Sequence, residues 1–266
     1  MTDRPTGQLN ATAADFYEEY FVPSLFGQRT GELLEVAQIS AGSSVLDVGC
    51  GTGILARAAR EHLGDSGTVI GIDRNEGMIA TARRVAPQIE WHIGQAESLP
   101  FDNAAFDHVI SQFALMFFEN RAGALTQMWR VTRPGGRLTV AVWDSIENTP
   151  GYAAMTKLDA RLFGDEIAQE LLTPYSMGDK TELLALFAEA GVADARVSTH
   201  PGMAHFDSIE AWVDLDLKGW TLGELIGAQG RQRLLAAARE ELQQFVLDDG
   251  SVAFASPSHI VTAVKT

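Results

Sequence analysis

The sequence predicts an α/β protein built around a parallel sheet, and three observations support this prediction. Short β-branched runs alternate with helical patterns between residues 45 and 143. A glycine-rich turn at 49–53 follows the first expected strand, and no linker composition interrupts the 266 residues. Such alternation makes neighbouring strands parallel, with helices on both faces of the sheet. Sheets of this kind bind ligands beyond the carboxyl ends of their strands.

The first half of the chain carries the clearest elements. Each expected strand is a short apolar run, and each expected helix has apolar residues at helical spacing. Asn75 is a suitable N-cap for one helix, and the segment 134–136 (Pro-Gly-Gly) ends another. The expected strands are 45–48, 69–72, 89–93, 106–111 and 137–143, and the expected helices are 54–63, 76–85 and 121–132.

The second half is less regular and predicts helical insertions. Residues 145–178 contain one helical pattern, near 152–163. The amphipathic segment 180–190 ends at Gly191, a residue type that commonly follows a helix. Further expected elements are strands at 195–199 and 260–264 and helices at 207–220 and 232–247. We therefore expect one domain, 1–266, with helical decorations.

The composition argues against several function classes. Apolar residues make up 46% and charged residues 21%, as in ordinary globular chains. The net charge of −15 argues against a nucleic-acid partner, because binding phosphates requires basic patches. No apolar stretch approaches the roughly 18 residues of a membrane span, and residues 1–10 do not resemble a secretory signal. A single cysteine, Cys50, fits a reducing compartment, so we expect a cytoplasmic protein.

The most informative stretch is the glycine turn and the strand before it. Glycines at 49, 51 and 53 let the backbone turn sharply and approach a ligand, and the helix that follows offers unpaired N–H groups. A dinucleotide fingerprint would need glycine where Ile54 stands, and a phosphate-binding Gly-Lys-Ser/Thr sequence is missing. The turn therefore favours a nucleotide-like ligand without a tightly held pyrophosphate.

Two aspartates accompany this turn. Asp73 ends the second expected strand, where a carboxylate can accept hydrogen bonds from a ribose diol, although a capping or surface role is the alternative. Asp47, inside the first strand, either organises the turn and the ligand's amino group or is a capped buried carboxylate. Cys50 lies within the turn as a small residue to which we assign no chemistry.

Four segments match one family together. They are VLDVGCGTG at 45–53, GIDRNEGMI at 71–79, GQAESLPFDNAAFDHVIS at 94–111 and VTRPGGRL at 131–138. With them the chain resembles the class I S-adenosylmethionine-dependent methyltransferases. It is similar in particular to the small-molecule group that includes the menaquinone and ubiquinone methyltransferases (methyltransferase type 11). Residues 144–266 match only loosely.

This resemblance implies a fold and a set of roles. The fold would be a Rossmann-like, doubly wound, seven-stranded, mostly parallel sheet with a reversed last strand and helical cap insertions. Its parts would be lid helices at 1–40, a cofactor-binding core at 41–143 and cap insertions at 144–178 and 201–257. The implied S-adenosylmethionine site comprises Asp47, Gly49, Cys50, Gly51, Gly53, Asp73, Arg74, Met78, Gln95, Ala96, Glu97, Ser111 and Phe113, with Tyr20 from the lid.

Within this site the resemblance distributes the roles by position. Gly49 and Gly51 would lie under the methionine part of the cofactor, and Asp73 would bind the ribose hydroxyls. Arg74 and Met78 would flank the adenine. Gln95, Ala96 and Glu97 would line the adenine edge, with Gln95 standing where the family often has Asp. Ser111 and Phe113 would lie near the sulfonium.

Catalytic residues are harder to predict, because the cofactor supplies the reactive methyl group. A general base is needed only if the acceptor must lose a proton, and His200, His205 and Tyr20 are weak candidates. Tyr17 and Tyr20 lie in a segment that either folds over the cofactor or packs as an ordinary amphipathic helix. No pair of histidines has metal-ligand spacing, so we predict no metal.

The cap insertions indicate the type of acceptor. They follow the fifth and sixth strands and are rich in large apolar groups, which indicates a small apolar or aromatic acceptor unless these groups are simply the cap's own core. The residues are Tyr152, Met155, Phe163, Tyr175, Met203, Phe206, Trp212 and Trp220.

The leading interpretation is a methyltransferase that methylates carbon or oxygen of a small molecule. One alternative is a protein that binds S-adenosylmethionine without methyl transfer. A nicotinamide-dependent oxidoreductase is disfavoured by Ile54. Methylation of nucleic-acid bases is disfavoured by the sequence Ser-Gln-Phe-Ala at 111–114, where such enzymes carry Asn/Asp-Pro-Pro-aromatic. The sequence leaves the oligomeric state open.

Overall fold

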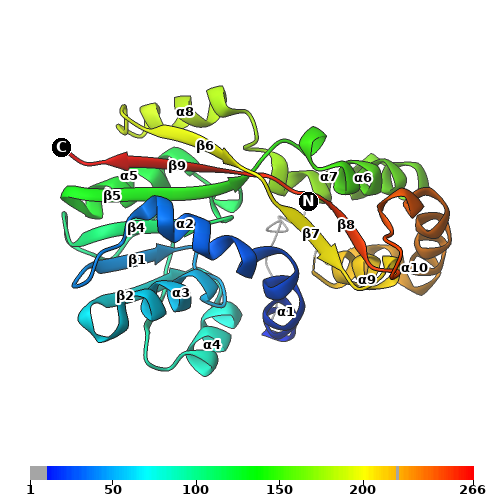
Figure 1. The fold of residues 1–266 in the computed structure, drawn as a ribbon, viewed down its shortest axis with the longest axis horizontal. Helices are drawn as coiled ribbons and strands as arrows, with labels where there is room; N and C mark the ends of the chain where they lie inside the picture. Colours follow the sequence, from blue (N-terminus) through cyan, green and yellow to red (C-terminus); the bar gives the residue numbers. More distant parts are fainter. Residues whose placement is uncertain (1–10, 220–221) are drawn as a thin grey trace, which may run out of the picture.

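Seven strands form one sheet in the computed structural model, which describes residues 11–219 and 222–266 (Figure 1). Their order is β3-β2-β1-β4-β5-β9-β6, and β7 and β8 form a separate two-stranded sheet. The strands are β1 (Ser44–Val48), β2 (Thr68–Asp73), β3 (Glu90–Ile93), β4 (Phe106–Gln112), β5 (Thr132–Trp143), β6 (Arg196–His200), β7 (Met203–Phe206), β8 (Val252–Ala255) and β9 (Ser258–Val264).

The sheet is mostly parallel, as the sequence predicts. Strands β1 to β5 pair in parallel, whereas β9 runs antiparallel to both β5 and β6. The reversed last strand therefore confirms the expected Rossmann-like topology. The strand order changes direction between β1 and β4, and a crevice for a ligand opens at this point in such sheets.

Helices flank the sheet and extend beyond it (Figure 1). Helices α2, α3, α4, α5 and α8 pack against the strands. The helices that the structure describes are α1 (Ala11–Phe16), α2 (Thr30–Ala37), α3 (Ile54–Leu63), α4 (Glu76–Val85), α5 (Arg121–Val131), α6 (Pro150–Phe163), α7 (Asp165–Leu172), α8 (Lys180–Glu189), α9 (Ile209–Gly219) and α10 (Leu222–Glu241). None of these has the length and apolar character of a membrane span.

A separate group of elements, which we call the cap, lies beyond one end of the sheet (Figure 1). It consists of α6, α7, α9, α10 and the antiparallel strand pair β7 and β8. Its core is aromatic. Trp212 is fully buried, stacks on Phe206 at 5.5 Å between ring centroids and packs on Phe254 at 4.8 Å. Tyr152 packs edge-on against Trp212. These rings are the cap's own core, and Trp220 lies outside the described residues.

Several elements differ from the sequence expectation. Strand β5 begins at Thr132 rather than 137, because Thr132 already pairs with Phe106 of β4. The insertion after β5 holds two helices, α6 and α7, rather than one. The sequence does not predict the pairing of β7 with β8, because each strand has only four residues and 45 residues of the chain, including α9 and α10, separate them. Helix α10 starts earlier than expected and bends at Gly227, whose φ is 63°.

Candidate active site

A cavity of about 170 Å³ lies at the carboxyl ends of β1, β2 and β4, beneath the N-terminal segment. We group its lining residues by chemistry into two sets, which we call its two ends. We call the first the glycine-loop end, formed by Asp47, Gly49, Cys50, Gly51, Asp73 and Asn75. We call the second the aromatic end, formed by Phe21, Phe26, Gln112, Phe113 and Phe117.

The glycine loop takes its shape from positive backbone angles. Gly49, Gly51 and Gly53 have φ of 70°, 55° and 87°, a region that residues with a Cβ rarely adopt. The backbone N–H groups of Gly49 and Cys50 donate to the carbonyl of Ile72 at 2.8 and 3.1 Å, which ties the loop to β2. A Cβ on Gly51 would meet no atom within 4 Å, so the loop leaves open space at that position.

The Asp73 carboxylate is held in one orientation by the backbone. Its Oδ2 accepts the N–H of Gly51 and its Oδ1 accepts the N–H of Asn75, both at 2.8 Å. Burial raises the pKa of Asp73, and these two hydrogen bonds oppose that rise because they stabilise the carboxylate. Asp73 thus lies beside the loop with a fixed orientation at the cavity wall.

Asp47 is the more deeply buried acid of the two. It is 1% exposed and accepts the N–H of Ala56, in the first turn of α3, at 3.0 Å. Burial, together with the nearby charge of Asp73, raises its pKa to about 8, although the hydrogen bond from Ala56 opposes the rise. Burial also raises the pKa of the Cys50 thiol well above its usual value, which agrees with the absence of any assigned chemistry there.

The side of the cavity next to α4 combines apolar and charged groups. Met78 and Ala96 are buried and line the cavity together with Arg74 and Glu97. Arg74 forms an ion pair with Glu119 at 2.7 Å. Arg74 is the only cation among the described residues that line the cavity, so this site offers no basic cluster for phosphates.

The N-terminal segment closes one wall of the cavity. Residues 17–26 form a π-helix that contains Pro23, which lacks a backbone N–H and so interrupts regular α-helical bonding. Two ion pairs fix this segment and α1 over the core, between Asp15 and Arg84 at 2.6 Å and between Glu18 and Arg57 at 2.7 Å.

The structure places Tyr17, rather than Tyr20, at the cavity. Tyr17 lines it, and burial together with the charge of Asp73 raises the pKa of Tyr17. Tyr20 points outward, is 45% exposed and packs on Phe16 at 4.6 Å between ring centroids. Tyr20 does not line the cavity, and its contact with a ligand stays a prediction.

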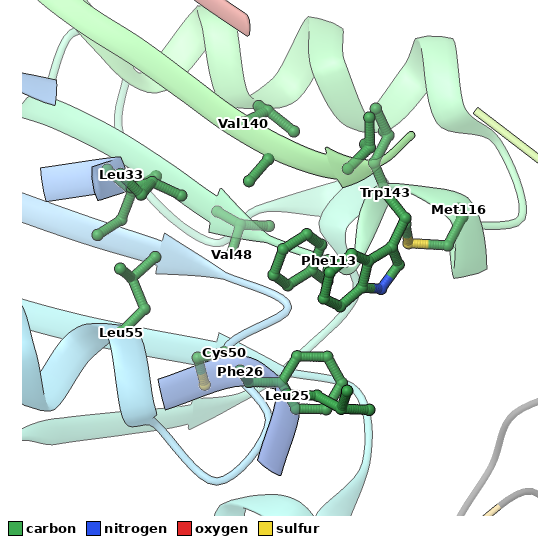
Figure 2. Close-up of a cluster of buried hydrophobic side chains, with 14 of the residues drawn as sticks. Leu25, Phe26, Leu33, Val48, Cys50, Leu55, Phe113, Met116, Val140 and Trp143 are labelled. Carbon is green, nitrogen blue, oxygen red and sulfur yellow. The ribbon is translucent and has the colours of Figure 1, made fainter. Parts of the chain in front are cut away.

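Aromatic rings from three distant parts of the chain pack together at the aromatic end, as Figure 2 shows for Phe26, Phe113 and Trp143. Phe26 and Phe113 line the cavity, whereas Trp143 packs on both of them and does not itself line it. Phe113 stacks on Trp143 with 3.8 Å between ring centroids and 5° between planes. Phe26 packs on Phe113 at 5.7 Å and on Trp143 at 6.0 Å. Phe113 has a φ of 54°, unusual for a residue with a large side chain, and its N–H donates to Ala141 at 2.9 Å.

Most of the predicted cofactor-binding residues meet at this cavity. Ten of them line it: Asp47, Gly49, Cys50, Gly51, Asp73, Arg74, Met78, Ala96, Glu97 and Phe113. Gly53 instead packs against Trp91, whose ring would lie 2.2 Å from a Cβ at that position. The Ser111 hydroxyl is buried and donates to Val48 at 2.7 Å, tying β4 to β1. Gln95 is exposed and does not line the cavity.

The two candidate histidines lie elsewhere. His200 ends β6, the outermost strand, and its Nε2 is 2.8 Å from the Ser198 hydroxyl. His205 is exposed on β7. Neither lines the cavity. Strands β5 and β9 separate β6 from β4, and β7 belongs to the separate two-stranded sheet. Within the described residues, no group of three or more metal-ligating side chains gathers either.

Sequence reasoning missed Phe26 and Gln112. Gln112 is the last residue of β4 and donates from Nε2 to the Phe26 carbonyl at 3.1 Å. The one available signal was that Gln112 precedes Phe113 at the end of a strand expected to reach the ligand. Phe26 belongs to no motif, and only the path of the N-terminal segment places it here.

Comparison with known proteins agrees with this geometry. A family model described as a methyltransferase domain matches residues 45–136. The chain is 30% identical over 187 residues to a demethylmenaquinone methyltransferase of Shouchella clausii, covering 64% of this chain and 79% of that protein. It is 33% identical over 184 residues to the same enzyme of Staphylococcus carnosus, covering 64% and 76%.

Solved structures share the fold. A phosphoethanolamine N-methyltransferase 2 of Haemonchus contortus, in complex with S-adenosylmethionine, aligns with a TM-score of 0.61 at 17% identity, over 96% of this chain and 57% of that one. An S-adenosylmethionine-dependent methyltransferase of Aquifex aeolicus aligns with a TM-score of 0.53 at 20% identity, over 72% and 91%. Together with the relatives and the family model, these findings establish that the chain belongs to the class I S-adenosylmethionine-dependent methyltransferases.

Proposed function

We propose that this methyltransferase binds S-adenosylmethionine along the glycine-loop end of the cavity and methylates a small aromatic or apolar acceptor at the aromatic end. The observation that carries the proposal is the division of one cavity into these two ends. Carboxylates and bare backbone line one end, and phenylalanine rings line the other.

The residues at the glycine-loop end suit the cofactor. S-adenosylmethionine carries a positive sulfonium, an ammonium group and two ribose hydroxyls, all of which favour carboxylate partners. Asp73, with both oxygens oriented by backbone N–H groups, would accept from the ribose hydroxyls. Asp47 is almost fully buried, and its carboxylate, once it has lost its proton, would favour the positive methionine end. Met78 and Ala96 would offer apolar contacts to the adenine.

The aromatic end suits a flat, apolar acceptor. Phe26 and Phe113 line this end, and Trp143, which does not line the cavity, packs on both rings and supports them. Aromatic walls bind aromatic ligands by burial and by offset or edge contacts. The relatives named demethylmenaquinone methyltransferases act, by their names, on a quinone compound, which supports an acceptor of this class for the present chain.

The chain's contribution to the reaction is orientation and exclusion of water. When bound, S-adenosylmethionine supplies an electrophilic methyl group. Phe113 and Phe26 would hold an acceptor in line with it, and alignment of this kind can lower a barrier by several kcal/mol, on the order of 7–11 at the limit. Tyr17 lines the cavity and stacks on Phe26 of the aromatic end, but burial raises its pKa, so its hydroxyl keeps its proton and does not act as a base. We therefore expect an acceptor whose carbon or oxygen is already nucleophilic.

The first test is a calorimetric titration of S-adenosylmethionine and S-adenosylhomocysteine, with Asp73→Ala as the comparison. We expect micromolar binding, weakened by about 1 kcal/mol or more in the variant because its hydrogen bonds to the ribose are lost. Transfer of a labelled methyl group to quinols, phenols and amines then identifies the acceptor class. Binding of the cofactor without transfer to any aromatic acceptor would contradict the acceptor part of the proposal.

A further inference from the structure

Gln112 lines the cavity, and its amide carries a buried acceptor atom without a hydrogen-bond partner among the described residues. Its Nε2 donates to the Phe26 carbonyl at 3.1 Å. A carbonyl oxygen only accepts hydrogen bonds, so the amide nitrogen must face Phe26 and the amide oxygen must face away from it. That oxygen, Oε1, is buried and has no hydrogen-bond partner among the described residues.

Leaving such an atom unpaired is costly. A buried acceptor without a donor costs about 1–3 kcal/mol, and most buried polar atoms in proteins have partners. Gln112 lines the cavity, so a bound ligand can supply the missing donor. The hydrogen bond to Phe26 holds the amide in one orientation before the ligand arrives, which lowers the entropic cost of binding.

The surroundings define the type of donor. Gln112 lies next to Phe113, whose ring stacks on Trp143, and Phe26 packs on both rings. Gln112 is therefore a polar residue in a wall that is otherwise aromatic. A single oriented acceptor beside aromatic rings suits a flat ring that bears a hydroxyl group, and it disfavours the same ring with that oxygen alkylated.

We propose that Gln112 is a specificity-determining residue that accepts a hydrogen bond from a ring hydroxyl of the methyl acceptor. This inference rests on the proposed function, because it assumes that the acceptor binds at the aromatic end. Gln112 takes no proton, since an amide is not a base at neutral pH. It orients the ring and selects hydroxylated aromatic acceptors over their ethers.

The test uses two stable probes, 1-naphthol and 1-methoxynaphthalene, titrated calorimetrically into the protein saturated with S-adenosylhomocysteine. We expect the natural sequence to bind the naphthol about fivefold more tightly, the value of one net hydrogen bond. Gln112→Met keeps the length of the side chain but removes the acceptor, so it should bring the two affinities within twofold. Gln112→Asn, which withdraws the amide by one methylene, should also lose the preference.

Gln28→Met is the matched control. Gln28 donates to the Met203 carbonyl at 2.8 Å and also anchors the N-terminal segment, but it does not line the cavity. We expect Gln28→Met to keep the fivefold preference for naphthol over its ether. This control therefore separates a weaker attachment of the N-terminal segment from the loss of hydroxyl recognition by Gln112. A preference that survives in both Gln112 variants overturns the inference and leaves the proposed function intact. If S-adenosylhomocysteine binds but neither probe does, the aromatic acceptor fails and the inference fails with it.

Discussion

The two ends of the cavity are built in different ways. At the glycine-loop end, the contacts that hold the site together join residues close in sequence, such as the hydrogen bond from Gly51 to Asp73, which are 22 residues apart. At the aromatic end, Gln112 reaches Phe26 across 86 residues. One βαβ unit therefore forms most of the glycine-loop end. The aromatic end forms only when the N-terminal segment packs against β4, which lies far away in the sequence. Local sequence specifies the first end, and tertiary packing specifies the second.

The most disruptive single methyl group would be one added to the glycine loop, next to the glycine-loop end. In Gly53→Ala the new Cβ would lie 2.2 Å from the Trp91 ring at a φ of 87°. Trp91 is buried, and its Nε1 donates to Ala86 at 2.9 Å, so the ring cannot easily move away. Overpacking and backbone strain together should lower the free energy of unfolding by about 3 kcal/mol, measured by urea denaturation.

Gly250→Ala is the matched control for this substitution. Gly250 has the same φ of 87°, but no atom lies within 4 Å of its added Cβ. We expect a loss of only about 1 kcal/mol from strain. Equal losses in the two variants would show that the clash with Trp91 contributes nothing and that the loop is less rigid than its contacts indicate.

The buried acid Asp47 gives the second prediction. Its pKa of about 8 lies above the value of a free carboxyl, so the folded state holds a proton that the unfolded state has released. Stability therefore falls as the pH rises from about 4 to about 8, by at most about 1.4 kcal/mol per pH unit for this group. Asp47→Asn removes the titrating proton, so its stability relative to the natural sequence should rise steadily across this window.

Urea denaturation of both proteins at several pH values between 4 and 9 measures this difference. The difference should level off above pH 8, where Asp47 is ionised in both states. Parallel curves for the two proteins would mean that Asp47 is already ionised in the fold. Binding of a ligand ammonium group at this end would then involve no release of a proton.

The contrast between the two ends also explains how far the sequence could predict the molecule. Helices α3 and α4 occur at the expected residues, 54–63 and 76–85, because strand, turn and cap signals surround them locally. Asp73 was identified for the same reason. The sequence does not predict which of Tyr17 and Tyr20 faces the cavity. The answer depends on the π-helical geometry of this segment, and no local sequence pattern predicts a π-helix.

The third prediction tests the aromatic end. Trp143→Leu removes the ring on which Phe113 stacks, so we expect kcat/KM for an aromatic acceptor to fall about tenfold. The Kd of S-adenosylhomocysteine should stay within twofold, because Trp143 does not line the cavity and packs on Phe26 and Phe113 of the aromatic end. Trp129→Leu, on the half-buried surface of α5, should leave both quantities unchanged. Equal losses of cofactor and acceptor binding in Trp143→Leu would mean that the two ends do not act separately.

The smallest expected effect concerns the ion pair of Arg74 and Glu119 at the rim of the glycine-loop end. The two charges are 2.7 Å apart, but the Glu119 side chain is 76% exposed. Exposed pairs contribute little, because water screens the charges and both long side chains lose freedom. Glu119→Gln should therefore change the Kd of S-adenosylhomocysteine by less than twofold in calorimetry.

The small size of this effect is informative beside the loss expected for Asp73→Ala. Asp73 lines the cavity and has its oxygens fixed by two backbone N–H groups, whereas Glu119 does not line it and accepts from one guanidinium, that of Arg74. If orientation by backbone N–H groups makes a carboxylate effective in binding the ligand, the Kd of S-adenosylhomocysteine should differ fivefold or more between Asp73→Ala and Glu119→Gln. A loss of fivefold or more in Glu119→Gln would instead show that the ion pair closes the rim over the ligand, and recognition would then extend beyond the βαβ unit.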